Sequence, residues 1–426
     1  MSRRRALPLR SLAPFQQHLG TPHFMDFDGA TAAWIVTKDV QAWQWIEKQG
    51  AGAMQNEKTF RIAVLPGDGI GPEVMAPCLR LLDRVVGEAG GFSLSYEEME
   101  AGAGLYQRSG TALPAETLER VGAADAILLG AMGLPGIYTP NGLEIAPQVD
   151  IREHFALFAG VRPLKTYPGM PVPLADPRAQ ALDAVLIRES TEGFFAGRGQ
   201  GRLENDAVAT ETMTITRAAS ERLFDFAFEL ARKRKGAGHP GRVTCVDKAN
   251  IFGTFAFFRK IFGERAARFP DVEADQCYVD AAAMRLVTQP WRFDVIVTEN
   301  LFGDILSDLA AGLMGGMGMA PSADIGVDRA VFQPCHGTAP DIAGQGKANP
   351  TAMFLSAAMM LEWLGEQHGV AACGLAGTRL RDAVESAFAG GELIPFEFGG
   401  RDGTVEITAG VGAALDSRPE QAAAGG

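Results

Sequence analysis

Two aspartates four residues apart, Asp304 and Asp308, lie in the largely apolar segment 298–309 of this 426-residue chain. A helix places residues i and i+4 on one face, so the two carboxylates would repel each other there. A divalent cation between them would remove the repulsion, and oxygen ligands suit a hard ion such as Mg²⁺ or Mn²⁺. The flanking Ile305, Leu306 and Leu309 are expected to be buried. The segment therefore predicts either a metal-binding helix or a solvated helix face with two unpaired acids.

Three further segments supply charged side chains beside apolar ones. Segment 242–251 predicts a buried strand that ends in Asp247, Lys248 and Asn250, and ligands bind at strand ends in α/β sheets. Asp280 lies between apolar neighbours, and Arg188 follows another apolar segment. Each could form a structural ion pair. Together they provide a lysine, a third carboxylate and a guanidinium, which suit a metal-bound carboxylate substrate.

Short apolar segments alternate with amphipathic ones, which predicts an α/β sheet with helices on both faces. The expected strands are 62–65, 126–130, 184–187, 242–246 and 295–298, and the expected helices are 72–87, 220–235, 252–262, 351–365 and 378–389. The glycine turn 67–71 follows a strand and opens a helix. Its spacing is GxGxG rather than GxGxxG, and no acid ends a suitable second strand, so a standard Rossmann fold is not expected.

From about residue 60 to about 415, the chain resembles the isocitrate/isopropylmalate dehydrogenase family, the β-decarboxylating dehydrogenases of 3-substituted malates. The motifs keep the family's order and are nearest in wording to its isopropylmalate members: 65–74 (LPGDGIGPEV), 161–163 (VRP), 246–250 (VDKAN), 278–280 (YVD), the two-aspartate helix, and 336–350 (HGTAPDIAGQGKANP).

The resemblance implies a two-domain α/β fold with mixed sheets flanked by helices and a catalytic groove between the domains. Residues 59–159 and 316–416 would form the cofactor-binding domain. Residues 160–315 would form the domain for dimerisation, metal and substrate, with an arm near 193–209 that interlocks two subunits.

The resemblance also implies roles for single residues. The family's substrate arginines match Arg152, Arg162 and Arg188. Lys248 matches the lysine that removes the proton of the substrate's C2 hydroxyl. Asp280, Asp304 and Asp308 match the metal ligands. In the family Lys248 and Asp280 reach into the other subunit's site, so a homodimer is expected.

The loop 336–350 carries the family's cofactor contacts. An acid at Asp341 would bind the ribose 2′-hydroxyl, which favours NAD over NADP because a carboxylate repels a 2′-phosphate. Asn349 would contact the adenine region. The full implied set is Asn250, His336, Gly337, Asp341 and Asn349. The implied cofactors are NAD and Mg²⁺ or Mn²⁺, with K⁺ as a candidate activator.

The chain departs from the family at Phe195, where relatives carry the tyrosine that donates the final proton. Phenylalanine has no hydroxyl and cannot donate. A water could protonate the enolate, Tyr138 could reach in from a glycine- and proline-rich loop, or the enzyme could oxidise without completing decarboxylation.

A second departure concerns specificity. Gln148 and Val149 replace paired leucines that hold the isopropyl group, and one methylene-scale contact is worth about 1–3 kcal/mol. Isocitrate enzymes usually offer a serine here, and none lies between Thr139 and Arg152. We expect NAD-dependent oxidative decarboxylation of a 3-substituted malate, with 3-isopropylmalate as the leading substrate. D-malate or tartrate, isocitrate or homoisocitrate, and a regulatory paralogue supported by Phe195 are the alternatives.

Composition agrees with a small-molecule enzyme. A net charge of −12 argues against a nucleic-acid surface, and no uncharged apolar run is long enough to span a membrane. The five cysteines are scattered, which predicts a reducing compartment without disulfides or a zinc site.

Residues 1–58 fall outside the family resemblance. Four arginines precede the first acid, Asp26, as in a mitochondrial transit peptide. The favoured interpretation is a start at Met54, which leads directly into the first strand and predicts a cytoplasmic enzyme. A partner-binding extension is a third interpretation. The tail 417–426 is small and polar and is expected to be disordered.

Overall fold

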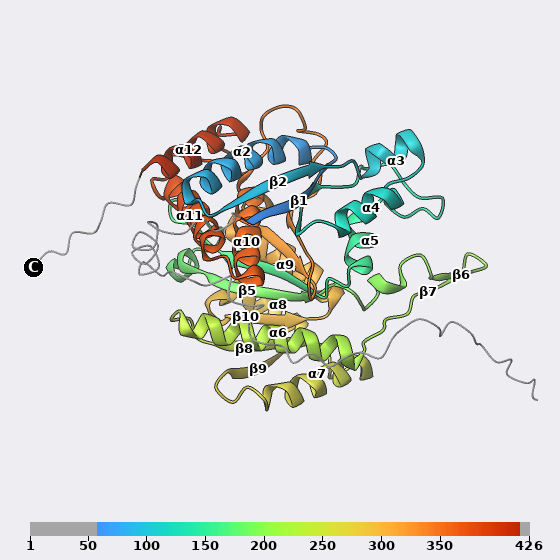
Figure 1. Ribbon diagram of the computed structural model, residues 1–426. Coiled ribbons are helices and arrows are strands. Elements are labelled where there is room, and N and C mark those ends of the chain that lie inside the picture. Colours follow the sequence, from blue (N-terminus) through green and yellow to red (C-terminus); the bar gives the residue numbers. More distant parts are fainter. Residues whose placement is uncertain (1–57, 418–426) are drawn as a thin grey trace, which may run out of the picture.

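The computed structural model describes residues 58–417. The predicted N-terminal segment 1–58 and the tail 417–426 lie outside this range except for Lys58 and Ser417. The described chain forms one ten-stranded mixed sheet between layers of helices, and a small two-stranded ribbon (Figure 1). The α/β architecture expected from the sequence is confirmed.

The large sheet consists of two parallel groups joined by an antiparallel seam. The order is β2-β1-β3-β12-β11-β4-β5-β10-β8-β9. The first parallel group is β2 (Phe92–Glu98), β1 (Lys58–Gly67), β3 (Ala126–Ala131) and β12 (Ala330–Pro334). The second is β5 (Asp183–Glu189), β10 (Val295–Thr298), β8 (Arg242–Asp247) and β9 (Glu273–Tyr278). Between them, β11 (Pro321–Ile325) and β4 (Ala159–Lys165) run antiparallel to each other and to their outer neighbours.

Eleven α-helices of the described range connect and cover these strands. They are α2 (Gly71–Ala89), α3 (Ala103–Ser109), α4 (Ala115–Gly122), α5 (Pro147–His154), α6 (Arg217–Gly236), α7 (Gly253–Ala266), α8 (Val279–Thr288), α9 (Asn300–Met314), α10 (Thr351–His368), α11 (Ala371–Ala389) and α12 (Thr404–Asp416). Helix α10 is buried from Thr351 to Gly365 and packs on β11, β12 and α11, which agrees with its largely apolar sequence. Between residues 58 and 417, no helix has the length and apolar character needed to cross a membrane.

The five expected strands and five expected helices are all present, most of them longer than expected. Sequence patterns missed β2, β4, β9, β11 and β12 and several helices, including α12. The edge strands β2 and β9 each contain a single buried residue and therefore lack an apolar run. Strand β11 is fully buried but carries Ser322 and Asp324, which interrupt its apolar pattern. All five cysteines are free, as expected.

The predicted arm corresponds to a ribbon of β6 (Arg202–Glu204) and β7 (Val208–Thr210) that projects from the body of the molecule (Figure 1). Every residue of the two strands is exposed, including Leu203 and Val208. Exposed apolar side chains on a two-stranded ribbon need a covering surface. Interlocking of two subunits through this arm, and the two-domain boundaries, stay predictions.

Candidate active site

Helix α9 carries both Asp304 and Asp308. It follows β10, and the buried Glu299 side chain caps it by accepting hydrogen bonds from two amides of the first turn (2.7 and 3.0 Å). Asp304 and Asp308 therefore lie one turn apart on one face, as predicted. The expected burial of Ile305 is wrong. Its side chain is exposed because α9 buries the stripe that contains Leu306 instead.

The aspartate pair fits a divalent cation. Partial burial and the neighbouring Asp304 carboxylate raise the pKa of Asp308 against the attraction of Arg188 and Arg162, and a cation between the two carboxylates would remove their repulsion. Arg188 pairs with Asp304. Among residues 58–417, no three His, Cys, Asp or Glu side chains converge on a common ion position, so Asp280 does not join this pair within one chain.

The three predicted substrate arginines converge from three elements: Arg152 from α5, Arg162 from β4 and Arg188 from β5. Burial and the nearby Arg152 and Arg162 guanidiniums together lower the pKa of Arg188 to about 10, against the attraction of Asp304. Three positive charges placed so closely require anionic partners. Their convergence fits the carboxylates of a substrate.

A carboxylate that sequence analysis missed supports two of these arginines. Asp324 on β11 is fully buried and accepts hydrogen bonds from Arg152 Nε (2.9 Å) and Arg162 Nη2 (3.0 Å). Gln333 Nε2 (3.1 Å) and Ser190 Oγ (3.5 Å) also donate to it. Burial opposes ionisation, but the two guanidiniums outweigh it and hold the pKa of Asp324 below its usual range. The available signal was an acid within an apolar segment.

The third arginine is held differently. Asn300 Oδ1 accepts hydrogen bonds from Arg188 Nε (2.9 Å) and Nη2 (2.7 Å), while Asn300 Nδ2 donates to the Glu192 carbonyl (3.0 Å). Gly303 lies beneath the arginine, because a Cβ there would stand 2.6 Å from Arg188 Cγ. These roles of Asn300 and Gly303 were not predicted, although both residues lie in the two-aspartate motif.

Phe195 also contacts Arg188. Its ring lies 4.9 Å from the guanidinium carbon, which is a cation–π arrangement. The residue that replaces the family's tyrosine is therefore part of the arginine's surroundings. Tyr138 is half exposed in its loop, and its proposed reach toward the substrate stays a prediction.

Lys248 and Asp280 form a separate pair. Asp247 is buried and binds Arg259 through both carboxylate oxygens (2.6 and 2.7 Å), which fixes the end of β8. The next residue, Lys248, donates to Asp280 Oδ1 (2.7 Å), and this hydrogen bond lowers the pKa of the exposed Asp280. Asn250, predicted to contact the cofactor, is exposed in the turn that follows.

Loop 336–350 is anchored by a residue that sequence analysis did not assign. Glu73 in the first turn of α2 accepts hydrogen bonds from the amides of Gly344 (2.8 Å) and Ala348 (3.3 Å) and from Thr404 Oγ1 (2.8 Å). The glycine turn also bonds to the loop, through Ile70 N and the Thr338 carbonyl (2.8 Å). The glycine motif thus positions loop 336–350, which is predicted to bind the cofactor.

Two residues of this loop fit a bound cofactor. His336 Nδ1 lies 2.9 Å from the Gly337 carbonyl, and burial lowers the pKa of the ring. Its Nε2 is buried without a hydrogen-bond partner in the described chain, so it can accept from a donor on a ligand. Asp341 is exposed at the loop surface. An orphaned acceptor and an exposed carboxylate on the same loop suit a nucleotide with ribose hydroxyls.

Asn349 is predicted to contact the adenine region, but both polar atoms of its side chain already have partners within the chain. Its Nδ2 lies 2.7 Å from Glu397 Oε1 and 3.4 Å from Met319 Sδ, and its Oδ1 accepts from Thr351 N (3.0 Å) at the start of α10. These contacts assign Asn349 a structural role within the chain. A cofactor contact through this side chain stays a prediction.

Residues 61–410 match the family model described as isocitrate/isopropylmalate dehydrogenase. The chain belongs to this family. Over 350 residues it is 42% identical to the 3-isopropylmalate/3-methylmalate dehydrogenase of Methanocaldococcus jannaschii. The match covers 82% of this chain and 96% of that protein. It is also 42% identical to the 3-isopropylmalate dehydrogenase of Methanothermobacter thermautotrophicus, over 84% of this chain and 99% of that one.

Solved structures agree with this membership. The isocitrate dehydrogenase of Methylococcus capsulatus superposes with a TM-score of 0.74 at 36% identity, covering 84% of this chain and all of that one. The chain is therefore a member of an oxidoreductase family whose dehydrogenases act on hydroxy acids, and the family resemblance inferred from its motifs is confirmed.

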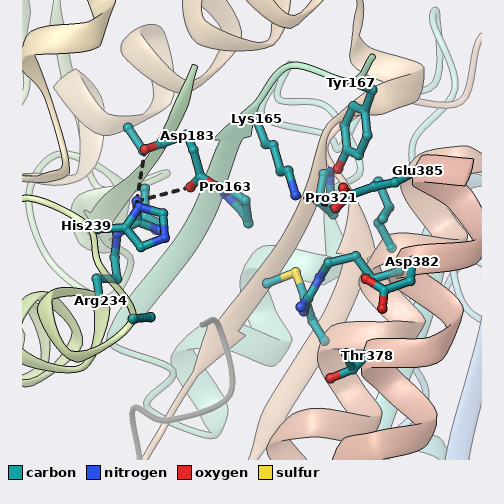
Figure 2. A pocket seen from close by; sticks show the side chains of 16 residues that line it. Pro163, Lys165, Tyr167, Asp183, Arg234, His239, Pro321, Thr378, Asp382 and Glu385 are labelled. Atoms are coloured by element: carbon teal, nitrogen blue, oxygen red, sulfur yellow. Dashed lines mark hydrogen bonds and ion pairs between the residues drawn. The ribbon is translucent and has the colours of Figure 1, made fainter. Parts of the chain in front are cut away.

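The other ends of β4 and β5 line a separate cavity of about 170 Å³, which we call the rear cavity (Figure 2). It also touches α6, α10 and α11. Lys165 pairs with Glu385, and Arg234 with Asp183 (3.0 Å). The charged side chains that line it come from both predicted domains and lie opposite one another.

Proposed function

We propose that this chain uses NAD to oxidise and decarboxylate a 3-substituted malate. The leading substrate is 3-isopropylmalate, which would give 2-oxo-4-methylpentanoate and CO₂, the oxidative step of leucine biosynthesis. The observation that carries the proposal is the convergence of three guanidiniums beside the Asp304–Asp308 pair. The names of the methanogen relatives support this substrate.

The arginines would hold the substrate's carboxylates and so fix the orientation of its C2–H bond. Arg162 is itself fixed, because its Nη1 donates to the carbonyls of Val161 (3.1 Å) and Ala323 (2.9 Å). Arg188 would exchange its pairing with Asp304 for a substrate carboxylate. Pre-organised positive charge of this kind lowers the cost of binding a dianion.

A divalent cation on Asp304 and Asp308 would acidify the substrate hydroxyl and stabilise negative charge, while NAD on loop 336–350 would accept the hydride. Lys248 would take the hydroxyl proton. In the proposed homodimer, Lys248 and Asp280 of one subunit complete the site of the other, with Asp280 as the third metal ligand. K⁺ is a candidate activator, and the proposed location is the cytoplasm.

The test compares NADH formation with CO₂ release over 3-isopropylmalate, D-malate, tartrate, isocitrate and homoisocitrate, with Mn²⁺ and K⁺ present. Both the full chain and a chain that begins at Met54 are assayed. Matching NADH and CO₂ on one acid would name the substrate and show that Phe195 is bypassed. NADH without CO₂ would identify oxidation alone. The absence of turnover on all five acids would contradict the proposal and favour the regulatory paralogue.

One observation favours a second candidate substrate, an acid with a hydroxyl at C3 such as tartrate. Gln148 lies one turn before Arg152 on α5, so both side chains share a helix face. Gln148 Oε1 is buried and has no hydrogen-bond partner among residues 58–417. A buried acceptor without a donor costs about 1–3 kcal/mol, which a substrate hydroxyl would recover. Preference for tartrate that is lost in Gln148→Leu would support this candidate.

A further inference from the structure

We propose that Asp324 is a positioning residue that limits the site to substrates with two carboxylates. The proposal rests on the proposed function, since it concerns the same three arginines. Nothing in the sequence motifs assigns a role to Asp324, which lies behind the arginines and has no exposed surface.

The charges around the site support this limit. Asp304 and Asp308 carry two negative charges, which a divalent cation cancels. The Lys248–Asp280 ion pair adds no net charge to whichever subunit's site contains it. The three guanidiniums then remain, and the Asp324 carboxylate neutralises one of them. Two positive charges are left for the substrate, which matches a dicarboxylate and leaves a third carboxylate without a partner in a site of low dielectric.

The geometry shows how Asp324 also orients the arginines. Its two oxygens bind different arginines, so it holds them at a fixed separation. It takes the Nε–H of Arg152, which leaves both terminal nitrogens of that guanidinium for a ligand. Gly160 on β4 provides the room, because a Cβ there would stand 3.1 Å from Asp324 Oδ1 and 2.6 Å from Ser190 Oγ.

The first test uses Asp324→Asn in the full chain, which removes the charge and keeps the shape. Binding of succinate, with two carboxylates, and tricarballylate, with three, is measured by calorimetry with Mn²⁺ and without NAD. In the variant, the ratio of the two affinities should shift toward tricarballylate by at least about tenfold. With reactive acids, the kcat/KM ratio should shift from 3-isopropylmalate toward isocitrate in the same direction.

A matched control removes a buried carboxylate elsewhere. Asp294 is 1% exposed and binds Arg234 Nε (2.5 Å) at the rear ends of the strands. Asp294→Asn should lower the thermal midpoint but leave the affinity ratio unchanged. An equal shift in this control would show that the ratio follows general loosening and would overturn the proposal.

A rescue variant separates charge from shape. Gln333 Nε2 donates to Asp324 Oδ2 (3.1 Å), so the double variant Asp324→Asn/Gln333→Glu exchanges amide and carboxylate. It should restore the wild-type ratio. If Asp324→Asn does not fold, the variant Gln333→Glu is used instead, which places a second carboxylate beside Asp324. Its affinity for tricarballylate relative to succinate should be lower than that of the double variant.

Parallel loss of both affinities in Asp324→Asn, with an unchanged ratio, would overturn the proposal and leave Asp324 a purely structural role. The two proposals fail differently. If the wild-type chain turns over none of the malates but the calorimetric ratio shifts as expected, the proposed function fails and the charge limit stands.

Discussion

The two ends of strands β4 and β5 differ in how their charges are paired. At the end that carries the proposed substrate arginines, which we call the substrate end, three arginines pair with only two carboxylates, Asp324 and Asp304. At the rear end, buried Arg234 has two carboxylates, Asp183 and Asp294, and Lys165 has Glu385. The same two strands thus carry fewer paired carboxylates than cations at one end and more at the other.

The difference separates charges that bind a ligand from charges that hold the fold. A buried ion that is fully paired in the free protein has no unmet interaction to offer a ligand. Arginines that share too few carboxylates are costly to the free protein, and they are retained where a ligand supplies the missing negative charge. Substitutions at the substrate end should therefore affect catalysis, and those at the rear end should affect stability.

The largest expected effect is that of Asp304→Asn. The variant loses a proposed metal ligand and the partner of Arg188, so kcat should fall by more than about 100-fold, beyond the usual loss for an indirect metal contact. Steady-state NADH formation at saturating Mn²⁺ measures it. Asp183→Asn, at the rear end, serves as the control and should keep kcat near the wild-type value. Comparable losses in both variants would remove the distinction between the two ends.

Next comes the pair Arg188→Lys and Arg234→Met. Lysine cannot reproduce the forked guanidinium, so Arg188→Lys should raise KM and lower kcat/KM by roughly 30-fold, equivalent to about 2 kcal/mol. Arg234→Met leaves Asp294 buried without its cation and should cost about 3–5 kcal/mol of unfolding free energy. Kinetics should show the larger loss of kcat/KM in Arg188→Lys, and denaturant unfolding should show the larger loss of unfolding free energy in Arg234→Met. A stability loss in Arg188→Lys equal to that in Arg234→Met would contradict the comparison.

The rear end should also show a pH dependence. Burial raises the pKa of Glu362 to about 7 against the attraction of Arg381, and Glu362 Oε1 has no hydrogen-bond partner in the described chain. The folded state therefore holds this proton more tightly than the unfolded state. Its stabilisation is complete below the unfolded pKa of 4.5 and is lost as pH rises through about 7. The thermal midpoint should fall between pH 5 and 8, and Glu362→Gln should flatten that slope. If Glu362→Gln keeps the wild-type slope, another group causes the pH dependence.

The smallest effect is expected at Phe195. Phe195→Leu removes the ring from Arg188 and should raise KM by several-fold, consistent with about 0.5–2 kcal/mol for a cation–π contact. Phe195→Tyr keeps the ring, so KM should stay near the wild-type value. The variant also adds a hydroxyl, so the ratio of CO₂ to NADH should rise if it is below one in the wild type. A KM increase in Phe195→Tyr equal to that in Phe195→Leu would show that the ring contact does not matter.

Motifs predicted much of the site, because short segments carry their own signal. The helical spacing of Asp304 and Asp308, and the position of Arg188 at the end of an apolar strand, can be read from neighbouring residues. Asp324 could not be found in this way, since its partners Arg162 and Arg152 lie 162 and 172 residues away in the sequence. Its role exists only after β11 pairs with β4.

Errors in the fold follow the same logic. Strands with uninterrupted apolar residues, such as β3 and β10, were predicted, whereas β11 and β12 carry buried polar residues such as Asp324 and Gln333 and were not. Ile305 looked buried because its neighbours are apolar. Which face of α9 is buried depends on packing that a local pattern does not contain.

The antiparallel seam has a consequence for how the chain reaches its native state. Strand β3 pairs with β12, and β4 with β11, so Ile127 meets Val331 and Val161 meets Ala323. During synthesis both early strands would keep an unpaired edge until almost the whole sheet has left the ribosome. Such non-local closure slows folding and exposes edges that can join another chain. Because its sheet is continuous, we expect the chain to depend on a chaperone while it is being synthesised.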